Sequence, residues 1–216
     1  MKNVLKTAYI IGNGASRKEF DLFDLQGRGK VFGCNALYRD FVDYNFMLPD
    51  YLVAIDYEII MEIEEHSNFP RERFINPPEE EKWEPIELHW KTSSDPNWNP
   101  ARPRSNAGMN AILEAIKKGY TSIYIFGFDF LVVDEDIALS NLYDGSPCYG
   151  METRANLNDT RGRMNYLGWV IEQHSDIKFF FCYPREVIVF KGIYTPEADN
   201  VQVLSFGKLI DLLVEE

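Results

Sequence analysis

The sequence predicts a single α/β domain, residues 1–216, with a Rossmann-like, mostly parallel sheet that has helices on both faces. Short apolar runs alternate with segments of helical period, which is typical of strands joined by crossover helices. These runs show no regular alternation of apolar and polar residues, as expected for strands buried on both faces. With 216 residues, 45% of them hydrophobic, the chain can form one well-buried domain.

The first four expected strands each end at a small or polar residue. They cover residues 8–11, 30–34, 51–55 and 122–126, and a fifth strand is expected at residues 177–182. In an open parallel sheet the ligand crevice lies beyond the carboxyl ends of the strands. Residues that follow the strands should therefore share one rim: Gly12, Asn35, Asp56 and Gly127.

Helical period is clearest at residues 106–118, where apolar residues recur every three or four positions. Ser105 or Asn106 is expected to cap the start of this helix, and Gly119 occupies the usual position of a glycine after a helix end. Further helices are expected at residues 57–65, 161–174 and 208–214, and one should begin near residue 17 behind a capping box formed by Ser16 and Glu19.

Two stretches, residues 68–104 and 130–158, show little periodicity. Irregular segments of this length in a compact domain are more often binding loops or lids than plain connections. Residues 130–158 are therefore expected to form a lid over the rim of the sheet.

The formal net charge of −12 argues against a broad nucleic-acid-binding surface, which requires Lys and Arg to neutralise phosphates. Three widely spaced cysteines support neither a disulfide framework nor a zinc site. There is no apolar run of membrane-spanning length and no cleavable signal pattern, so a cytoplasmic location is expected. The run 134–136 (Asp-Glu-Asp) could hold a divalent cation, but solvated charge is the commoner use of such a run, and no metal site is predicted.

Two segments are candidates for phosphate binding. Gly12, Asn13 and Gly14 follow the first strand directly, where glycines permit a sharp turn and close approach of a ligand; a plain tight turn is the alternative. Residues 105–108 open the best-predicted helix after two arginines, and free amides at a helix start attract anions. An ordinary capped helix with solvated arginines is the alternative here.

No histidine in the sequence is an obvious candidate for a general base. His66, His89 and His174 lie in settings that favour structural roles, so Asp or Tyr is expected to act as the general base. Asp129 could orient a ribose hydroxyl, act as the base, or cap the next loop.

The chain resembles a group of known enzymes in the order and spacing of its motifs over about residues 8–130. The motifs are residues 11–16 (IGNGAS), 34–38 (CNALY), 105–108 (SNAG) and 123–130 (IYIFGFDF). They are similar to those of the bacterial sialyltransferases of the Campylobacter lipooligosaccharide type, and to the related archaeal 6-hydroxymethylpterin diphosphokinase-like proteins. The sialyltransferases bind a cytidine monophosphate sugar on a Rossmann-like sheet without metal.

The resemblance implies specific contacts. Phosphate or ribose would meet Asn13 and Asn35, phosphate would lie at Ser105 and the amides from Asn106 onward, and the nucleoside would contact residues 127–129 (Gly-Phe-Asp). Tyr143 and Tyr149 would belong to the lid.

The chain departs from the sialyltransferases in two places. The family's histidine base is absent from residues 156–161 (NLNDTR), where Asp159 or else Asp144 could replace it, and Asp56 stands where the family has Asn. The expected catalytic residues are Asp159 and Asp129.

The expected function is transfer of a sugar from a nucleotide-sugar donor to an acceptor, without a tightly bound cofactor. The sugar, the nucleobase, the acceptor and the oligomeric state stay open. One alternative is an ATP-dependent pterin-type diphosphokinase, which would require Mg²⁺. The other is a nucleotide-binding module without catalytic activity.

Overall fold

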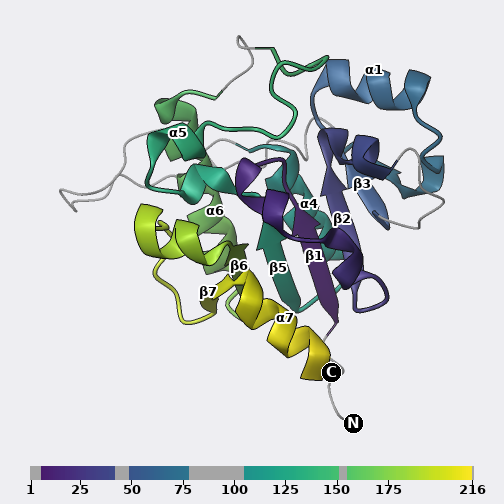
Figure 1. Ribbon diagram of the computed structural model, residues 1–216. Coiled ribbons are helices and arrows are strands. Elements are labelled where there is room, and N and C mark those ends of the chain that lie inside the picture. The colour runs from purple at the N-terminus through teal and green to yellow at the C-terminus, as the bar shows by residue number, and fades with distance from the viewer. Residues whose placement is uncertain (1–5, 42–48, 78–104, 151–154, 216) are drawn as a thin grey trace.

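The computed structural model describes residues 6–41, 49–77, 105–150 and 155–215. Its centre is a seven-stranded, fully parallel sheet in the order β4-β3-β2-β1-β5-β6-β7 (Figure 1). The strands are β1 Thr7–Ile11, β2 Lys30–Cys34, β3 Tyr51–Val53, β4 Phe74–Ile75, β5 Ser122–Phe126, β6 Lys178–Tyr183 and β7 Val201–Ser205.

The α-helices are α1 Tyr57–His66, α4 Ala107–Lys117, α5 Glu135–Ala138, α6 Leu157–Gln173 and α7 Phe206–Glu215. Shorter turns are the 3₁₀ helices η1 Ala15–Glu19, η2 Leu22–Leu25, η3 Asn35–Phe41, η4 Arg71–Arg73 and η5 Asp129–Leu131, and the π-helical turn η7 Val187–Lys191. None of the helices in the described part of the chain combines the length and the apolar character needed to cross a membrane.

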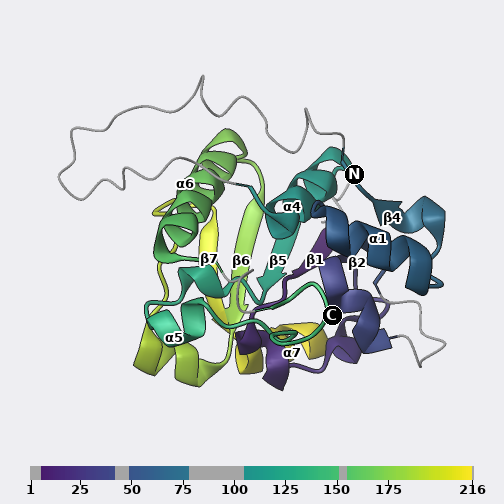
Figure 2. The same ribbon diagram turned by 90° about the horizontal axis from the view of Figure 1, so that it is seen from above.

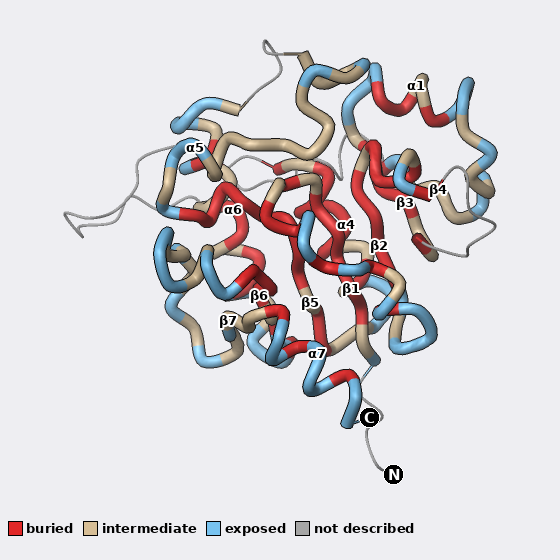
Figure 3. The backbone as a smooth tube through the Cα atoms, viewed as in Figure 1, coloured by how far each residue is buried: buried red, intermediate tan, exposed pale blue. Residues whose placement is uncertain are grey.

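Helices cover both faces of the sheet, as the sequence predicts. One face packs against α4 and α6, and the other packs against α1, α7 and η2, so two apolar clusters flank the strands. Figure 2 shows α4 and α6 on the side opposite α7, and Figure 3 shows the buried strands between partly exposed helices. Successive side chains of β1 point to opposite faces of the sheet. Ile10 packs on the face covered by α4, and Tyr9 and Ile11 pack on the face covered by α7.

The strand order reverses its direction between β1 and β5. From β1 the chain steps outward through β2, β3 and β4, and then returns through α4 to β5 on the other side of β1. The tips of these two strands are tied together, because the Gly12 amide donates to the Phe126 carbonyl at 2.8 Å and the Gly14 amide to the Gly127 carbonyl at 3.0 Å. A crevice at such a reversal is the usual ligand site of this architecture.

Several sequence expectations need correction. Ser16 and Glu19 form no capping box; η1 begins after Gly14 without a side-chain cap, because the Ser16 hydroxyl donates to Asp129 instead. Helix α6 starts at Leu157, four residues earlier than expected, because Asn156 and Asp159 form the capping box there. The strands β4 and β7 were not anticipated. Residues 78–104, which include His89, lie outside the described residues.

Candidate functional site

A cavity of about 360 Å³ opens at the carboxyl ends of β1, β2, β3 and β5. Its remaining walls are the start of α1, the start of α4, residues 138–149 and the first turns of α6. Its volume falls within the range of about 300–1,000 Å³ that is typical of small-molecule sites. Most of the residues that the sequence singles out line this cavity: Gly12, Asn13, Gly14, Asn35, Asp56, Asn106, Gly127, Phe128, Asp129 and Asp159.

Ser105 was also expected at this site, but it does not line the cavity. Its side chain is buried behind the start of α4, and its hydroxyl accepts a hydrogen bond of 2.8 Å from the Asn110 amide. The hydroxyl therefore stabilises the first turn of the helix from within the protein, and it does not line the cavity. Residues 106–108, at the start of α4, line the cavity instead.

Glycines in the loop after β1 are required by packing against the tip of β5. A Cβ on Gly12 would lie 2.7 Å from the Gly127 carbonyl oxygen, and one on Gly14 would overlap the Asp129 carboxyl group. Gly127 itself has φ of 64°, a left-handed conformation that favours glycine. Gly12 and Gly14 were expected to permit a sharp turn and close approach of a ligand, with a plain tight turn as the alternative. In the structure, the end of β5 and Asp129 occupy the space that a Cβ would need.

Asp129 holds the loop after β1 in place. Its side chain is 3% exposed, and its two oxygens accept hydrogen bonds from Ser16, one from the backbone N–H at 2.9 Å and one from the hydroxyl. Burial raises the pKa of Asp129 from 3.8 to about 6, although the hydrogen bonds from Ser16 and the charge of Arg17 oppose that rise. These contacts show Asp129 as an anchor of the cavity wall.

Two asparagines present polar atoms at the strand tips. The side-chain oxygens of Asn13 and Asn35 are buried, and neither has a hydrogen-bond partner within the described part of the chain. Asn35 also has φ of 50°, an uncommon conformation for a residue with a side chain. Buried polar atoms are nearly always satisfied in folded proteins, and backbone strain concentrates at ligand sites. Among the described residues, these features mark the tips of β1 and β2 as incompletely hydrogen-bonded and, at Asn35, unusual in backbone conformation.

The start of α4 faces the cavity with backbone donors. The Asn106 side chain accepts from the Met109 amide at 2.9 Å and so caps the helix as expected. The amides of Ala107 and Gly108 belong to the first turn, which has no acceptor within the helix, and both residues line the cavity. Backbone N–H groups at the positive end of a helix dipole are suited to binding an anion. Arg102 and Arg104 lie outside the described residues.

Residues 139–150, here called the cover segment, contribute to the cavity wall and contact the strand tips. The Leu142 amide donates to the Asn13 carbonyl at 2.9 Å, and the Asn13 side-chain nitrogen lies 3.2 Å from the Tyr149 hydroxyl. Tyr149 and Tyr143 pack together with their ring centroids 5.6 Å apart. The expected lid tyrosines thus meet over the β1 loop.

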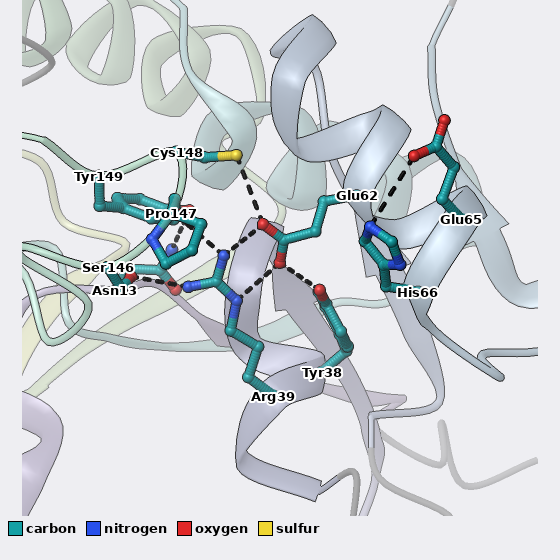
Figure 4. A network of polar contacts seen from close by, with 10 residues as sticks. All are labelled: Asn13, Tyr38, Arg39, Glu62, Glu65, His66, Ser146, Pro147, Cys148 and Tyr149. Carbon is teal, nitrogen blue, oxygen red and sulfur yellow. Dashed lines mark hydrogen bonds and ion pairs between the residues drawn. The ribbon is translucent and has the colours of Figure 1, made fainter.

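Two arginines that the sequence analysis did not single out hold the cover segment. Arg39 of η3 donates to the Ser146 hydroxyl at 2.7 Å and to the Pro147 carbonyl at 2.9 Å (Figure 4). Glu62 of α1 orients this guanidinium through two hydrogen bonds of 2.7 and 2.5 Å. The fork geometry of arginine is suited to such a paired contact with a carboxylate.

Arg17 forms the second of these contacts with the cover segment. Its guanidinium lies 2.9 Å from both the Asp40 carboxylate and the Tyr143 hydroxyl, and it also donates to the Gly12 carbonyl at 2.8 Å. Arg17 is 4% exposed although it is charged, and it occupies the position at which a dinucleotide-binding motif has its third glycine. That substitution is the sequence signal for its structural role.

Acidic side chains dominate the charged part of the wall. Asp56, Glu58, Asp129, Asp144 and Asp159 line the cavity, and Arg163 is the only Lys or Arg among the described lining residues. Asp159 lies in the first turn of α6, where its carboxylate also accepts from the Asn156 amide.

The described residues contain no group of three or more His, Cys, Asp or Glu side chains arranged to hold a metal ion. In the run 134–136, Asp134 caps α5 and pairs with Lys191 at 2.6 Å, and that hydrogen bond lowers its pKa. None of the three lines the cavity. His66 is exposed beside Glu65, and His174 ends α6, so neither contributes to the cavity.

Comparison with known proteins finds no match to this chain among protein-family models, curated proteins or solved structures.

Proposed function

We propose that the cavity binds a nucleotide-sugar and that the chain transfers the sugar to an acceptor hydroxyl. The observation that carries this proposal is the position of the cavity. It lies at the reversal of strand order, between the tips of β1 and β5, and the start of α4 opens into it. Doubly wound sheets bind nucleotides in that position, with phosphate at a helix start.

Each part of the site has a role in this reaction. The amides of Ala107 and Gly108 receive the phosphate of the donor, and the side chains of Asn13 and Asn35 receive hydroxyl groups of the ribose or the sugar. Asp159, in the first turn of α6, is the candidate general base.

The proposed transfer moves the sugar from the phosphate oxygen of the donor to the oxygen of the acceptor. The acceptor hydroxyl gives its proton to the Asp159 carboxylate, and its oxygen forms a bond to the anomeric carbon of the sugar. The bond between that carbon and the phosphate oxygen breaks, and the electron pair leaves with the nucleotide. Backbone N–H groups at the start of α4 stabilise the negative charge that develops on the leaving phosphate.

A thermal-shift panel of CMP, UDP, GDP and ATP, each with and without Mg²⁺, tests the binding step. A nucleotide at about 100 times its Kd should add about 2.7 kcal/mol to the free energy of unfolding. Stabilisation by CMP, UDP or GDP without Mg²⁺, together with slow hydrolysis of the corresponding sugar nucleotide, supports sugar transfer. A response to ATP that requires Mg²⁺ would favour the diphosphokinase instead, and binding without turnover would favour an inactive module.

Asn13→Asp tests the location of the site. The change keeps the size of the side chain but places a negative charge at the cavity wall, so we expect nucleotide binding to weaken at least about tenfold. Asn68→Asp is the matched control, because Asn68 is exposed and lies outside the cavity. Equal nucleotide affinity in the two variants would move the site elsewhere.

A further inference from the structure

The cover segment is tied together by its own backbone. The Gly145 amide donates to the Tyr149 carbonyl at 2.8 Å, and the Tyr149 amide donates to the Ser146 carbonyl at 3.0 Å. The Ser146 amide in turn donates to the Tyr143 carbonyl at 2.9 Å, and the rings of Tyr143 and Tyr149 pack together. Because these contacts join residues 143–149 to one another, the segment should attach and detach as one cooperative unit.

Two ion pairs of the body of the protein dock the cover segment. Arg39 of η3 pairs with Glu62 of α1 at 2.5 Å (Figure 4). Arg17 of η1 pairs with Asp40 of η3 at 2.9 Å. None of these four charged side chains belongs to the segment itself. The segment meets the pairs through neutral groups, which are the hydroxyls of Tyr143 and Ser146, the carbonyl of Pro147 and the thiol of Cys148.

The cover segment can leave these docks without separating either ion pair. Separation of a buried pair is costly, because it leaves a desolvated charge without its partner. A hydrogen bond from a guanidinium to a neutral oxygen is different, since water can replace the oxygen when the segment departs. The Arg39 guanidinium also contacts the rings of Tyr143 and Tyr149, whose centroids lie 5.7 and 5.6 Å away. Release of the segment breaks these contacts but leaves Arg39 paired.

We infer that Arg39 and Arg17 are positioning residues that dock and release the cover segment, and that this equilibrium controls access to the cavity. When the segment is docked, Tyr149 lies against Asn13 at the cavity wall, and the Leu142 amide is bonded to the loop after β1. When it is released, the cavity loses that part of its wall, while the two ion pairs remain on the body. Opening of this kind does not depend on which ligand the cavity binds.

A buried thiol inside the cavity can report opening without any ligand. Cys34 ends β2, is 3% exposed and lines the cavity, whereas Cys182 of β6 is 0% exposed and lies outside it. Burial raises the pKa of both thiols, that of Cys34 to about 12. Both are therefore protonated and protected at neutral pH in the closed protein, and their rates of alkylation report how often each is exposed.

Alkylation of the full chain with iodoacetamide, followed at each cysteine by mass spectrometry, measures this exposure. The protein carries Cys148→Ser, because alkylation of Cys148 would disturb the dock and serine keeps a donor for Glu62. We expect Cys34 to react at least about tenfold faster than Cys182, because local opening is less costly than global unfolding. Equal rates would mean that the cavity is reached only through unfolding, and the inference would be wrong.

Arg39→Gln should raise the rate at which Cys34 is alkylated at least about tenfold, because the variant loses the hydrogen bonds of a charged donor to the segment. Amide hydrogen exchange should rise by the same factor at Leu142, Gly145 and Tyr149, since one opening exposes all three amides. An unchanged alkylation rate would overturn the inference. Unequal factors at the three amides would contradict a single opening unit.

Arg71→Gln is the matched control, because Arg71 also pairs with a glutamate of α1, Glu64, and lies outside the cavity. It should leave both rates unchanged, and an equal rise there would mean a general loss of stability instead of release from a dock. Ser146→Ala alters the same dock from the other side and keeps the ion pair intact. It should raise the alkylation rate of Cys34 severalfold, so it decides the question even if Arg39→Gln fails to fold.

Nucleotides provide a second, independent readout. For whichever of CMP, UDP and GDP binds the wild type, stopped-flow measurement should show a faster association in Arg39→Gln, because only the open state admits a ligand. The association rate constant should rise by the same factor as the alkylation rate. Faster dissociation with unchanged association would show a distorted site and no control of access. If none of the three binds, the proposed function fails, and alkylation of Cys34 still decides whether Arg39 docks the segment.

Discussion

Replacing Asp129 by asparagine should remove a pH dependence from the stability of the fold. The buried carboxyl of the wild type has a pKa of about 6, above its ordinary 3.8. Between those two values the folded chain keeps a proton that the unfolded chain has released. The stability that this group contributes is therefore complete below about pH 4 and is lost as the pH rises through about 6.

The structure sets the expected magnitude. The interval from 3.8 to about 6 corresponds to about 3 kcal/mol in the free energy of unfolding. Asparagine matches the neutral carboxyl group in shape, because its oxygen can accept from the Ser16 amide and its NH₂ group can donate to the Ser16 hydroxyl. Asp129→Asn should thus gain about 3 kcal/mol relative to the wild type between about pH 4 and about pH 7.

Urea unfolding of both proteins at several pH values measures this difference. Other titrating groups are common to the two chains, so their contributions cancel when one free energy of unfolding is subtracted from the other. A difference that stays constant from about pH 4 to about pH 7 would refute the argument, because it would mean that Asp129 titrates alike in the folded and unfolded chains.

Three further predictions concern stability and are checked by urea or thermal unfolding. Gly14→Ala should destabilise the fold by about 1–3 kcal/mol, because its Cβ overlaps the Asp129 carboxyl group. Gly168→Ala, in open space within α6, should instead stabilise the fold by about 0.5–1 kcal/mol, and equal effects of the two changes would contradict the packing argument. Arg39→Ala should destabilise by about 2 kcal/mol because it leaves the largely buried Glu62 without its guanidinium, and an effect near zero would show that the pair is solvated. Asn156→Ala should cost about 1 kcal/mol through loss of the α6 cap, unless the Asp159 side chain alone sustains that turn.

Local sequence signals predict much of the fold. The first four expected strands end where small or polar residues were identified, within two residues of the observed ends. Asn106 caps α4 and Gly119 has φ of 79°, as the helix signals indicate. These features depend on neighbours in the chain, so a single sequence is sufficient to predict them.

Features that depend on distant partners were missed or misread. Ser16 and Glu19 have the spacing of a capping box, but the Ser16 hydroxyl donates to the carboxylate of Asp129, 113 residues away in the sequence. Strand β4 has only two residues, which is too short to show periodicity. Strand β7 was missed for a different reason, since the alternation of apolar and polar residues in Val-Gln-Val-Leu could have identified it. Ser105 was assigned to the phosphate site from its place at a helix start and from the family resemblance, but its hydroxyl is buried against Asn110, five residues further along the chain.

The candidate site was predictable in outline for a topological reason. Parallel strands place their carboxyl ends on one rim, so residues after successive strands converge whatever the loops between them do. The contacts of Arg39 with the cover segment follow no such rule, because they join residues 107 and 108 positions apart through side chains. Rim residues could therefore be predicted. Of the two arginines that hold the cover segment, only Arg17 has a local sequence signal, its place in a glycine motif, and Arg39 has none.

The order of the strands also determines when this cavity can form as the chain folds. Its walls combine groups from residue 12 to residue 163, and the central strand β1 acquires its neighbour β5 only after more than a hundred intervening residues have been made. Contacts of such long sequence separation close late and slowly, since the loop entropy is lost before the contact is gained. A chain still emerging from the ribosome can pair β1 with β2, yet the cavity is not complete until α6 has been synthesised.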